Sequence, residues 1–205
     1  DSTINLLGGE PLRPVMNYMR EEDEEPDELA QISKEGYGGI LCIETGGPTP
    51  GLGCAGRGII AALEELEKKG AYEKYQPDVV IYDVLGDVVC GGFSMPMRKG
   101  YADKVFIITS GESMSVYAAA NIAMAVENFK SRGYASLGGF ILNKRNVKNE
   151  EEKAAELAAD FHSSVIAEID RSDLVSEAED MRKTVMEAFP DSTVAEQYKA
   201  LADKI

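Results

Sequence analysis

Apolar, β-branched runs alternate along this chain with segments in which apolar residues recur every three or four positions. The runs predict buried strands and the helical spacing predicts amphipathic helices. The expected strands are 40–44, 79–83, 104–109, 138–143 and 164–169. The expected helices are 59–69, 116–129, 150–161, 174–188 and 193–204, after a loop and a short helix over 1–20. Alternation of this kind predicts an α/β fold, with a mostly parallel sheet flanked by helices.

The strand expected at 79–83 leads into a segment whose polar residues can carry chemistry. It ends at Asp83 and is followed by Gly86, Asp87 and Cys90. Ligands of open α/β sheets sit beyond the carboxyl ends of the strands, where an aspartate can hold hydrated Mg²⁺. Glycine lets the connecting loop change conformation. The segment therefore suggests that nucleotide state at the aspartates is coupled to whatever Cys90 binds.

A second cysteine, Cys54, lies in a glycine-proline loop over 45–58 that follows the strand expected at 40–44. Loops of this length inside a compact domain are usually functional. Glycines beside Cys54 and Cys90 supply backbone N–H groups and room for a bulky cluster, which favours an iron–sulfur centre over two ordinary buried thiols. Cys42, within an apolar run, is expected to be structural. Two cysteines per chain are too few for four ligands, but a symmetric homodimer would supply them.

Composition narrows the classes of function. A length of 205 residues fits one domain with a substantial core. The net charge of -15 argues against nucleic acid or an anionic membrane as partner. Because the chain has neither a signal-peptide pattern nor an apolar run long enough to cross a bilayer, a cytoplasmic protein is expected. Three widely spaced cysteines do not form a disulfide framework, and the single His162 is expected to be a bystander.

Two segments, 46–58 and 83–93, closely resemble the two signature motifs of the nitrogenase iron protein family. Other stretches fall in that family's order and spacing: Gly36-Tyr37-Gly38-Gly39, Gly70-Ala71-Tyr72, Met95-Pro96-Met97-Arg98, Leu137-Gly138-Gly139, Asn143-Lys144-Arg145-Asn146, Thr184-Val185-Met186-Glu187 and Tyr198-Lys199-Ala200-Leu201-Ala202. The resemblance runs across essentially the whole chain. It implies a P-loop NTPase fold of the nitrogenase iron protein kind, as one domain over residues 1–205.

The resemblance also implies an ATP-dependent homodimeric reductase with MgATP and one [4Fe–4S] cluster that bridges the two subunits. Cys54 and Cys90 match the cluster ligands. Asp83 and Asp87 match the aspartates that sense Mg-nucleotide, and Asp1 resembles the last aspartate of the family's first switch segment.

Three further residues are assigned by a combination of residue chemistry and resemblance. Asn143 ends a strand, where its amide could pair with a purine edge, and it matches a residue near adenine. Arg57 matches the docking-face arginine that is a target of ADP-ribosylation in some family members. Arg98 is expected to join Arg57 on the face where a partner docks.

The resemblance implies partners as well. Electrons would arrive from a donor such as ferredoxin or flavodoxin and pass to a larger catalytic redox protein, such as the nitrogenase molybdenum–iron protein. An electron donor of a tetrapyrrole reductase, for a chlorophyll precursor or a nickel tetrapyrrole, is the nearest rival. The stretch 55–58 favours the nitrogenase type, whereas Val194 and Tyr101 depart from the residues usual in nitrogenase iron proteins. The chain could instead be a ParA/MinD-like ATPase switch without redox chemistry, or hold a structural zinc ion at a dimer axis.

One departure from the family concerns the phosphate-binding loop. The Gly-x-x-x-x-Gly-Lys-Ser/Thr pattern, whose backbone and lysine cradle the phosphates of ATP, does not occur in this sequence. The chain is therefore expected to be a fragment, truncated at both ends, that lacks the N-terminal P-loop unit and a C-terminal tail. By itself it is expected not to hydrolyse ATP well.

Overall fold

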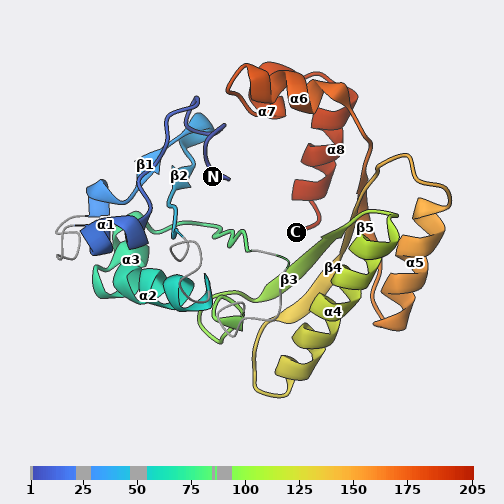
Figure 1. Cartoon of the computed structure of the whole chain (residues 1–205), viewed down its shortest axis with the longest axis horizontal. Helices are drawn as coiled ribbons and strands as arrows, with labels where there is room; N and C mark the ends of the chain where they lie inside the picture. The colour runs from blue at the N-terminus through green and yellow to red at the C-terminus, as the bar shows by residue number, and fades with distance from the viewer. Residues whose placement is uncertain (1, 22–28, 47–54, 85, 87–93) are drawn as a thin grey trace. The chain divides into compact units, whose positions relative to one another are not determined.

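The computed structural model describes residues 2–21, 29–46, 55–84, 86 and 94–205, without the side chains of 20, 21 and 55–57. The chain divides into two compact units (Figure 1). Unit 1 comprises residues 1–83, 90–95 and 177–188, and unit 2 comprises 84–89, 96–176 and 189–205.

Unit 2 is built on a parallel sheet of three strands. The strands are β3 (Lys104–Thr109), β4 (Ser136–Asn143) and β5 (Val165–Ile169), in the order β3-β4-β5. β3 and β4 pair from Lys104 opposite Ser136 to Thr109 opposite Leu142. These strands lie where the apolar runs predict them, and their parallel pairing confirms the α/β class.

Helices cover both faces of this sheet. α4 (Ser113–Lys130) and α5 (Glu150–Asp160) lie on one face, and α8 (Thr193–Ala202) lies on the other, against β5 (Figure 1). The core of the unit forms where α4 and α5 meet the sheet, and its buried residues are Ile107, Ala119, Ala123, Phe140, Leu157 and Ala158. Alanines on the inner face of α4 let the helix approach the strands closely.

Two consecutive glycines let β4 pass between its neighbours. A Cβ at Gly138 would lie 2.6 Å from the Phe106 ring, and one at Gly139 would lie 2.6 Å from Cγ2 of Ile166. Gly139 also has a φ of 145°, which other residues rarely adopt. Register shifts accompany this kink on both sides of β4.

Unit 1 consists of one 14-residue helix, α2, and several shorter elements around a small apolar core. Its helices are α1 (Val15–Glu21), η1 (Leu29–Gln31), η2 (Tyr37–Gly39), α2 (Ala55–Lys68), α3 (Ala71–Tyr75) and α7 (Val185–Ala188). Its strands β1 (Lys34–Glu35) and β2 (Leu41–Cys42) pair antiparallel. The buried residues include Leu7, Val15, Leu29, Ile32, Cys42, Ala62, Leu63 and Leu66.

The prediction of a strand at 79–83 is wrong, and of the strand predicted at 40–44 the structure contains only the two residues of β2. Val79 is 74% exposed and Ile81 is 78% exposed, whereas a central parallel strand would bury both. A strand needs a neighbour to accept and donate its backbone hydrogen bonds, and no strand in the described part of the chain pairs with these residues. An apolar run favours burial, but it forms a strand only where a neighbouring strand pairs with its backbone.

The helix expected at 174–188 divides into α6 (Asp173–Asp180) and α7. The break comes at Arg182, whose φ of 58° is left-handed. The backbone N–H of Arg182 donates to Glu179 O at 2.9 Å, and that of Lys183 donates to Ala178 O at 2.9 Å, which closes the helix end.

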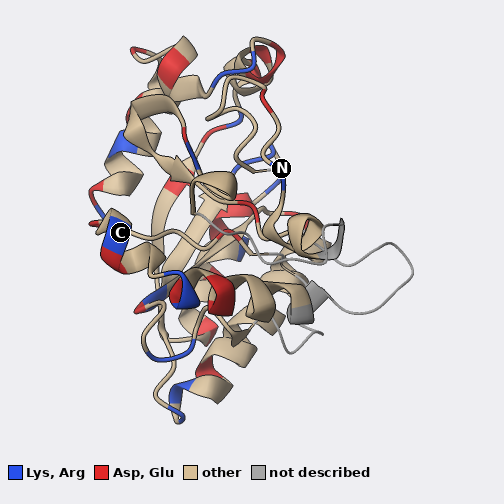
Figure 2. Ribbon diagram, turned by 90° about the vertical axis from the view of Figure 1, so that its left-hand side faces the viewer, with Lys and Arg blue, Asp and Glu red and all other residues tan. Residues whose placement is uncertain are grey.

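Acidic residues occur on helices of both units, including α2, α5 and α6 (Figure 2). Among the helices that the structure describes, none has the length and apolar character needed to cross a membrane.

Candidate functional site

The structure does not describe the side chains of five residues predicted for the site. Asp1, Cys54, Asp87 and Cys90 lie outside the described residues, and Arg57 belongs to α2 without a described side chain. Their assignment as cluster ligands, switch aspartates and docking arginine therefore stays a prediction.

Cys42 is the cysteine that the structure does describe, and it is buried with 2% of its surface exposed. Its Sγ lies 3.5 Å from Ile40 O. Burial raises the pKa of this thiol, and the Glu44 carboxylate raises it further. The structure thus confirms the burial expected of a structural cysteine at Cys42.

A cluster of iron and sulfur needs thiolate ligands that can come together. The part of the chain that the structure describes contains no group of three or more His, Cys, Asp or Glu side chains that could hold a metal. Because Cys42 is buried, the thiols of Cys54 and Cys90 remain the predicted ligands of an iron–sulfur cluster.

Asp83 lies exposed at the end of an extended segment of unit 1. The residue before it is anchored, since the hydroxyls of Tyr82 and Tyr72 lie 3.1 Å apart. That contact ties the segment to α3 and leaves the Asp83 carboxylate facing solvent, where a hydrated cation can reach it.

Asn143 is the last residue of β4 and lies exposed at the carboxyl edge of the unit 2 sheet, opposite Ile169. The next backbone N–H, that of Lys144, donates to Ile169 O at 2.9 Å and so extends the pairing with β5. The amide of Asn143 is thus held at the strand ends where nucleotides bind in open α/β sheets.

Glu150 shapes the loop that follows Asn143. Its buried Oε2 accepts hydrogen bonds from the backbone N–H of Arg145 at 2.9 Å and of Val147 at 3.3 Å. Within this loop, Asn146 and Asn149 adopt left-handed φ angles of 60° and 58°, which asparagine tolerates better than most residues.

Lys144 joins three carboxylates at the same edge. Its Nζ lies 2.8 Å from Glu168, 3.1 Å from Glu151 and 3.4 Å from Asp170. The hydrogen bonds that the Lys144 ammonium donates to Glu168 and then to Glu151 raise its pKa. Asp170 and Gln197 of α8 bond each other twice, at 3.0 Å and 2.8 Å. This network fastens the ends of β4 and β5 to α5 and α8.

The loop after β3 reaches the same edge. Ser110 N donates to Oγ of Ser115 at 2.9 Å, and Lys153 Nζ donates to Gly111 O at 2.9 Å. A Cβ at Gly111 would lie 2.2 Å from that of Glu150, so only glycine fits there. The loop after β3, the loop after β4 and the start of α5 therefore pack together at the edge where β4 ends in Asn143.

Arg98 lies at the opposite end of this sheet, exposed in a bend after buried Met97. Met97 O accepts a hydrogen bond from Ala135 N, just before β4 begins, at 2.7 Å. The length of β4, on the order of 20 Å for eight residues, separates Arg98 from Asn143. A docking role for Arg98 and a nucleotide role for Asn143 would thus fall at different ends of unit 2.

Thr3 and Glu44 form a pair in unit 1 that the sequence pattern does not predict. Glu44 Oε1 accepts from Thr3 N at 3.1 Å and from Thr3 Oγ1 at 2.7 Å. The residues lie 41 positions apart, so no local pattern signals the contact. The roles of Glu150 and Lys144 are likewise not predicted from the sequence, although Lys144 follows a strand-ending Asn143.

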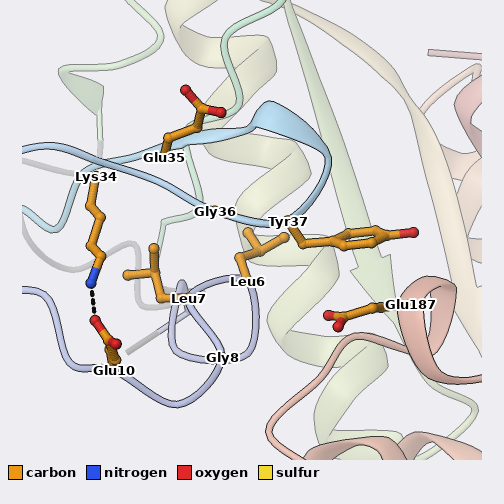
Figure 3. Close-up of a pocket in the computed structure, with 9 residues that line it drawn as sticks. All are labelled: Leu6, Leu7, Gly8, Glu10, Lys34, Glu35, Gly36, Tyr37 and Glu187. Atoms are coloured by element: carbon orange, nitrogen blue, oxygen red, sulfur yellow. Dashed lines mark hydrogen bonds and ion pairs between the residues drawn. The ribbon is translucent and has the colours of Figure 1, made fainter.

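Unit 1 also has an open depression of about 310 Å³. Figure 3 shows Lys34 and Glu10 facing each other as an ion pair at one end, with Tyr37 and Glu187 at the other. Its lining consists of Leu6, Leu7, Gly8, Glu10, Lys34, Glu35, Gly36, Tyr37 and Glu187. None of the predicted site residues is among these described lining residues.

Comparison with known proteins adds a relationship over the full length. A sequence model of the family described as "4Fe-4S iron sulfur cluster binding proteins, NifH/frxC family" matches residues 1–205. The chain is 47% identical, over 207 aligned residues, to the nitrogenase iron protein of Methanospirillum hungatei JF-1. That alignment covers 100% of this chain and 73% of the relative.

Among solved structures, the fold is similar to two ATPases of low sequence identity. The Pyrococcus furiosus cell division ATPase MinD aligns with a TM-score of 0.71 and 13% identity over 98% of this chain and 78% of that one. The ParA family ATPase of Chlorobium tepidum TLS aligns with a TM-score of 0.68 and 14% identity over 97% and 78%. At such identities the likeness concerns the fold alone.

Proposed function

The chain belongs to the NifH/frxC family of 4Fe-4S iron–sulfur cluster binding proteins, and from this premise we propose that it serves an ATP-dependent reductase as its electron-transfer component. The observation that carries the proposal is the family match over residues 1–205, which includes both glycine-flanked cysteines. The burial of Cys42 supports it, because Cys54 and Cys90 remain as the thiols for the cluster.

In this proposal two copies of the protein together supply four thiolates, Cys54 and Cys90 from each. A bound [4Fe–4S] cluster supplies one-electron redox chemistry. Homodimerisation follows from the ligand count, because one chain has too few free thiols for four-fold ligation.

Polar residues would hold the nucleotide. Asn143, at the carboxyl edge of the sheet, offers an amide donor and an acceptor, which matches the amino group and ring nitrogen of adenine. Asp83, Asp87 and Asp1 would respond to the Mg²⁺ and the phosphates. Glu150 and Lys144 hold the loop and strand end that present Asn143.

The partner in this proposal is a larger redox protein that docks near Arg57 and Arg98. The nitrogenase molybdenum–iron protein is the first candidate because the relative at 47% identity is a nitrogenase iron protein. A tetrapyrrole reductase is the second. Transfer of electrons to each purified catalytic component in turn, measured by its product, distinguishes the two.

A switch ATPase without redox chemistry is the second candidate function, and the fold similarity to MinD and ParA proteins favours it. The two functions differ in whether Cys54 and Cys90 hold iron. A MinD- or ParA-like role gives no reason for cysteines with glycine neighbours in two separate loops.

The deciding experiment is iron and sulfide analysis, with EPR of the reduced sample, on the protein containing this chain purified without oxygen. We expect a paramagnetic cluster in the wild type, and its loss in Cys54→Ala and in Cys90→Ala. A dimer free of iron that still binds MgATP would favour the switch ATPase. Zinc in place of iron would identify a structural metal site instead.

A further inference from the structure

The hydrogen bonds between Thr3 and Glu44 connect two segments that the proposed function assigns to different tasks. Thr3 follows Asp1, the predicted nucleotide-responsive aspartate, by two residues. Glu44 precedes Cys54, the predicted cluster ligand, by ten residues. One half-buried carboxylate oxygen accepts both the backbone N–H and the hydroxyl of Thr3, at 3.1 Å and 2.7 Å. Hydrogen bonds to an ionised acceptor are stronger than neutral ones.

Glu44 and the residue after it are also fixed from the other side. Glu44 O accepts the backbone N–H of Val15 at 2.9 Å, and Thr45 O accepts that of Met16 at 3.1 Å. These bonds attach the segment after β2 to the start of α1. The backbone of Glu44 and Thr45 is therefore held against the start of α1, while the Glu44 side chain holds Thr3.

The two described flanks of the Cys54 segment meet at this same place. Gly46 has a φ of 81°, and a Cβ there would lie 2.8 Å from Cβ of Pro14. A Cβ at Gly58, in the first turn of α2, would lie 3.5 Å from Cγ of Met16 and 3.8 Å from Gly46 O. The chain therefore enters and leaves the Cys54 segment at closely packed points beside Glu44.

The pair is not needed to hold the first residues in place. Leu7 is buried at 7% exposure, and the backbone N–H of Tyr37 donates to Leu6 O at 2.8 Å. Glu44 also lies beyond the last residue of β2, so its side chain contributes nothing to the pairing of β1 with β2. Loss of the Thr3 hydroxyl should consequently leave unit 1 folded.

We propose that Glu44 is a positioning residue that links the nucleotide-responsive segment at residues 1–3 to the flanks of Cys54. Nucleotide binding moves Thr3, Thr3 moves Glu44, and Glu44 moves the packed flanks, which changes the reduction potential of the cluster. This inference rests on the proposed function. The sequence already predicts one connection between nucleotide and cluster, from Asp83 through Asp87 to Cys90. The inference adds a second connection, which reaches the cluster through Cys54.

The test measures the reduction potential of the cluster in the dimeric holoprotein, by EPR-monitored titration with and without saturating MgADP. Thr3→Val keeps the shape of the side chain and removes the donor. We expect it to lose at least half of the nucleotide-induced shift in potential and to keep the nucleotide-free potential. Thr3→Ser, which keeps the hydroxyl, should restore the shift.

Two further changes separate coupling from stability. Glu44→Gln keeps the accepting oxygen and should retain most of the shift, whereas Glu44→Ala should lose it. Thr184→Val is the matched control, because it removes another hydroxyl of unit 1, one that accepts from Glu187 N at 3.2 Å, away from this pair. It should leave the shift unchanged.

Hydrogen exchange of the same holoproteins gives a second readout. Nucleotide should change the protection of residues 58–62 in α2 in the wild type, and Thr3→Val should abolish that change. A wild-type shift in potential that survives intact in both Thr3→Val and Glu44→Ala overturns the inference, as does a wild-type cluster whose potential ignores nucleotide. A preparation that holds no cluster overturns the proposed function itself.

Discussion

Cys42 lies at the end of β2 with 2% of its surface exposed, and burial raises the pKa of its thiol. A thiol must lose its proton to bind a metal or to attack an alkylating reagent. Its burial among apolar neighbours therefore makes Cys42 a packing residue. The glycine-rich surroundings of Cys54 and Cys90 in the sequence predict a different chemistry for those two thiols.

This difference predicts that Cys42→Ala keeps the full iron content. The cavity left by the buried sulfur should reduce the free energy of unfolding by about 1 kcal/mol. Iron analysis and thermal unfolding of the variant measure both. In the native wild type, iodoacetamide should modify Cys42 far more slowly than after unfolding. Loss of iron in Cys42→Ala, with the fold intact, would contradict the structural role.

Lys144 connects several elements, because its ammonium pairs with carboxylates on β5, on α5 and on the residue after β5. Isolated ion pairs on a surface contribute little to stability. Here the Lys144 side chain is only 19% exposed and serves three acids at once. The network also lowers the pKa of two carboxyl groups. The pKa of Asp170 is lowered by the hydrogen bond that Gln197 donates and then by the Lys144 charge. The pKa of Glu151 is lowered by a backbone hydrogen bond and then by Lys144.

These shifts fix the sign of a pH prediction for Lys144→Met. A carboxyl group whose pKa is lower in the folded protein than in the unfolded chain stabilises the fold. This contribution is fully present above the pKa of the unfolded chain, about 4, and is lost as the pH falls through the pKa of the folded protein. The raised Lys144 pKa adds stability that is fully present below about pH 10. Lys144→Met should therefore lower the Tm by a few degrees near pH 7, and the gap to the wild type should shrink below about pH 4.

Thermal unfolding followed by circular dichroism between pH 2 and pH 8 measures this gap. Lys130→Met is the matched control, because its partner Glu127 lies 3.4 Å away on the exposed face of α4. It should change the Tm little at any pH. If the two variants behave alike, the network at the sheet edge contributes no more than an ordinary surface pair.

At the scale of the whole protein, the ligand count connects the cluster to association. The net charge of -15 per chain makes two copies repel each other. A stable dimer therefore needs an attractive interaction that offsets this repulsion. A cluster held by two thiolates from each copy would provide that interaction.

Native mass spectrometry should accordingly find two chains with one cluster of about four iron ions. Removal of the iron with a chelator, or Cys54→Ala, should raise the dissociation constant of the dimer at least about tenfold, which equals about 1.4 kcal/mol of association energy. Sedimentation velocity checks the change. A complete cluster on a single chain, or a dimer of equal stability without iron, would contradict a bridging site.

Much of the α/β fold follows from local patterns in the sequence. The run at 104–109 predicts β3 at its observed bounds, and the helical spacing of α2 places Leu63 and Leu66 in the core, where both are buried. The family is predicted by two cysteine motifs that need no structure to be recognised. The roles of Asp1, Cys54, Asp87 and Cys90 come from those motifs alone and stay predictions, because these residues lie outside the described part of the chain.

Tertiary structure decided the features that depend on partners distant in sequence. Residues 79–81 are as apolar as a buried strand but lie exposed, and Glu65 is 3% exposed in a helix whose pattern marks it as polar surface. The Thr3–Glu44 pair and the network around Lys144 join residues that no periodicity relates. A sequence pattern reports how strongly each segment tends to be buried. Which groups meet to form a strand, a hydrogen bond or an ion pair depends on how the segments pack together.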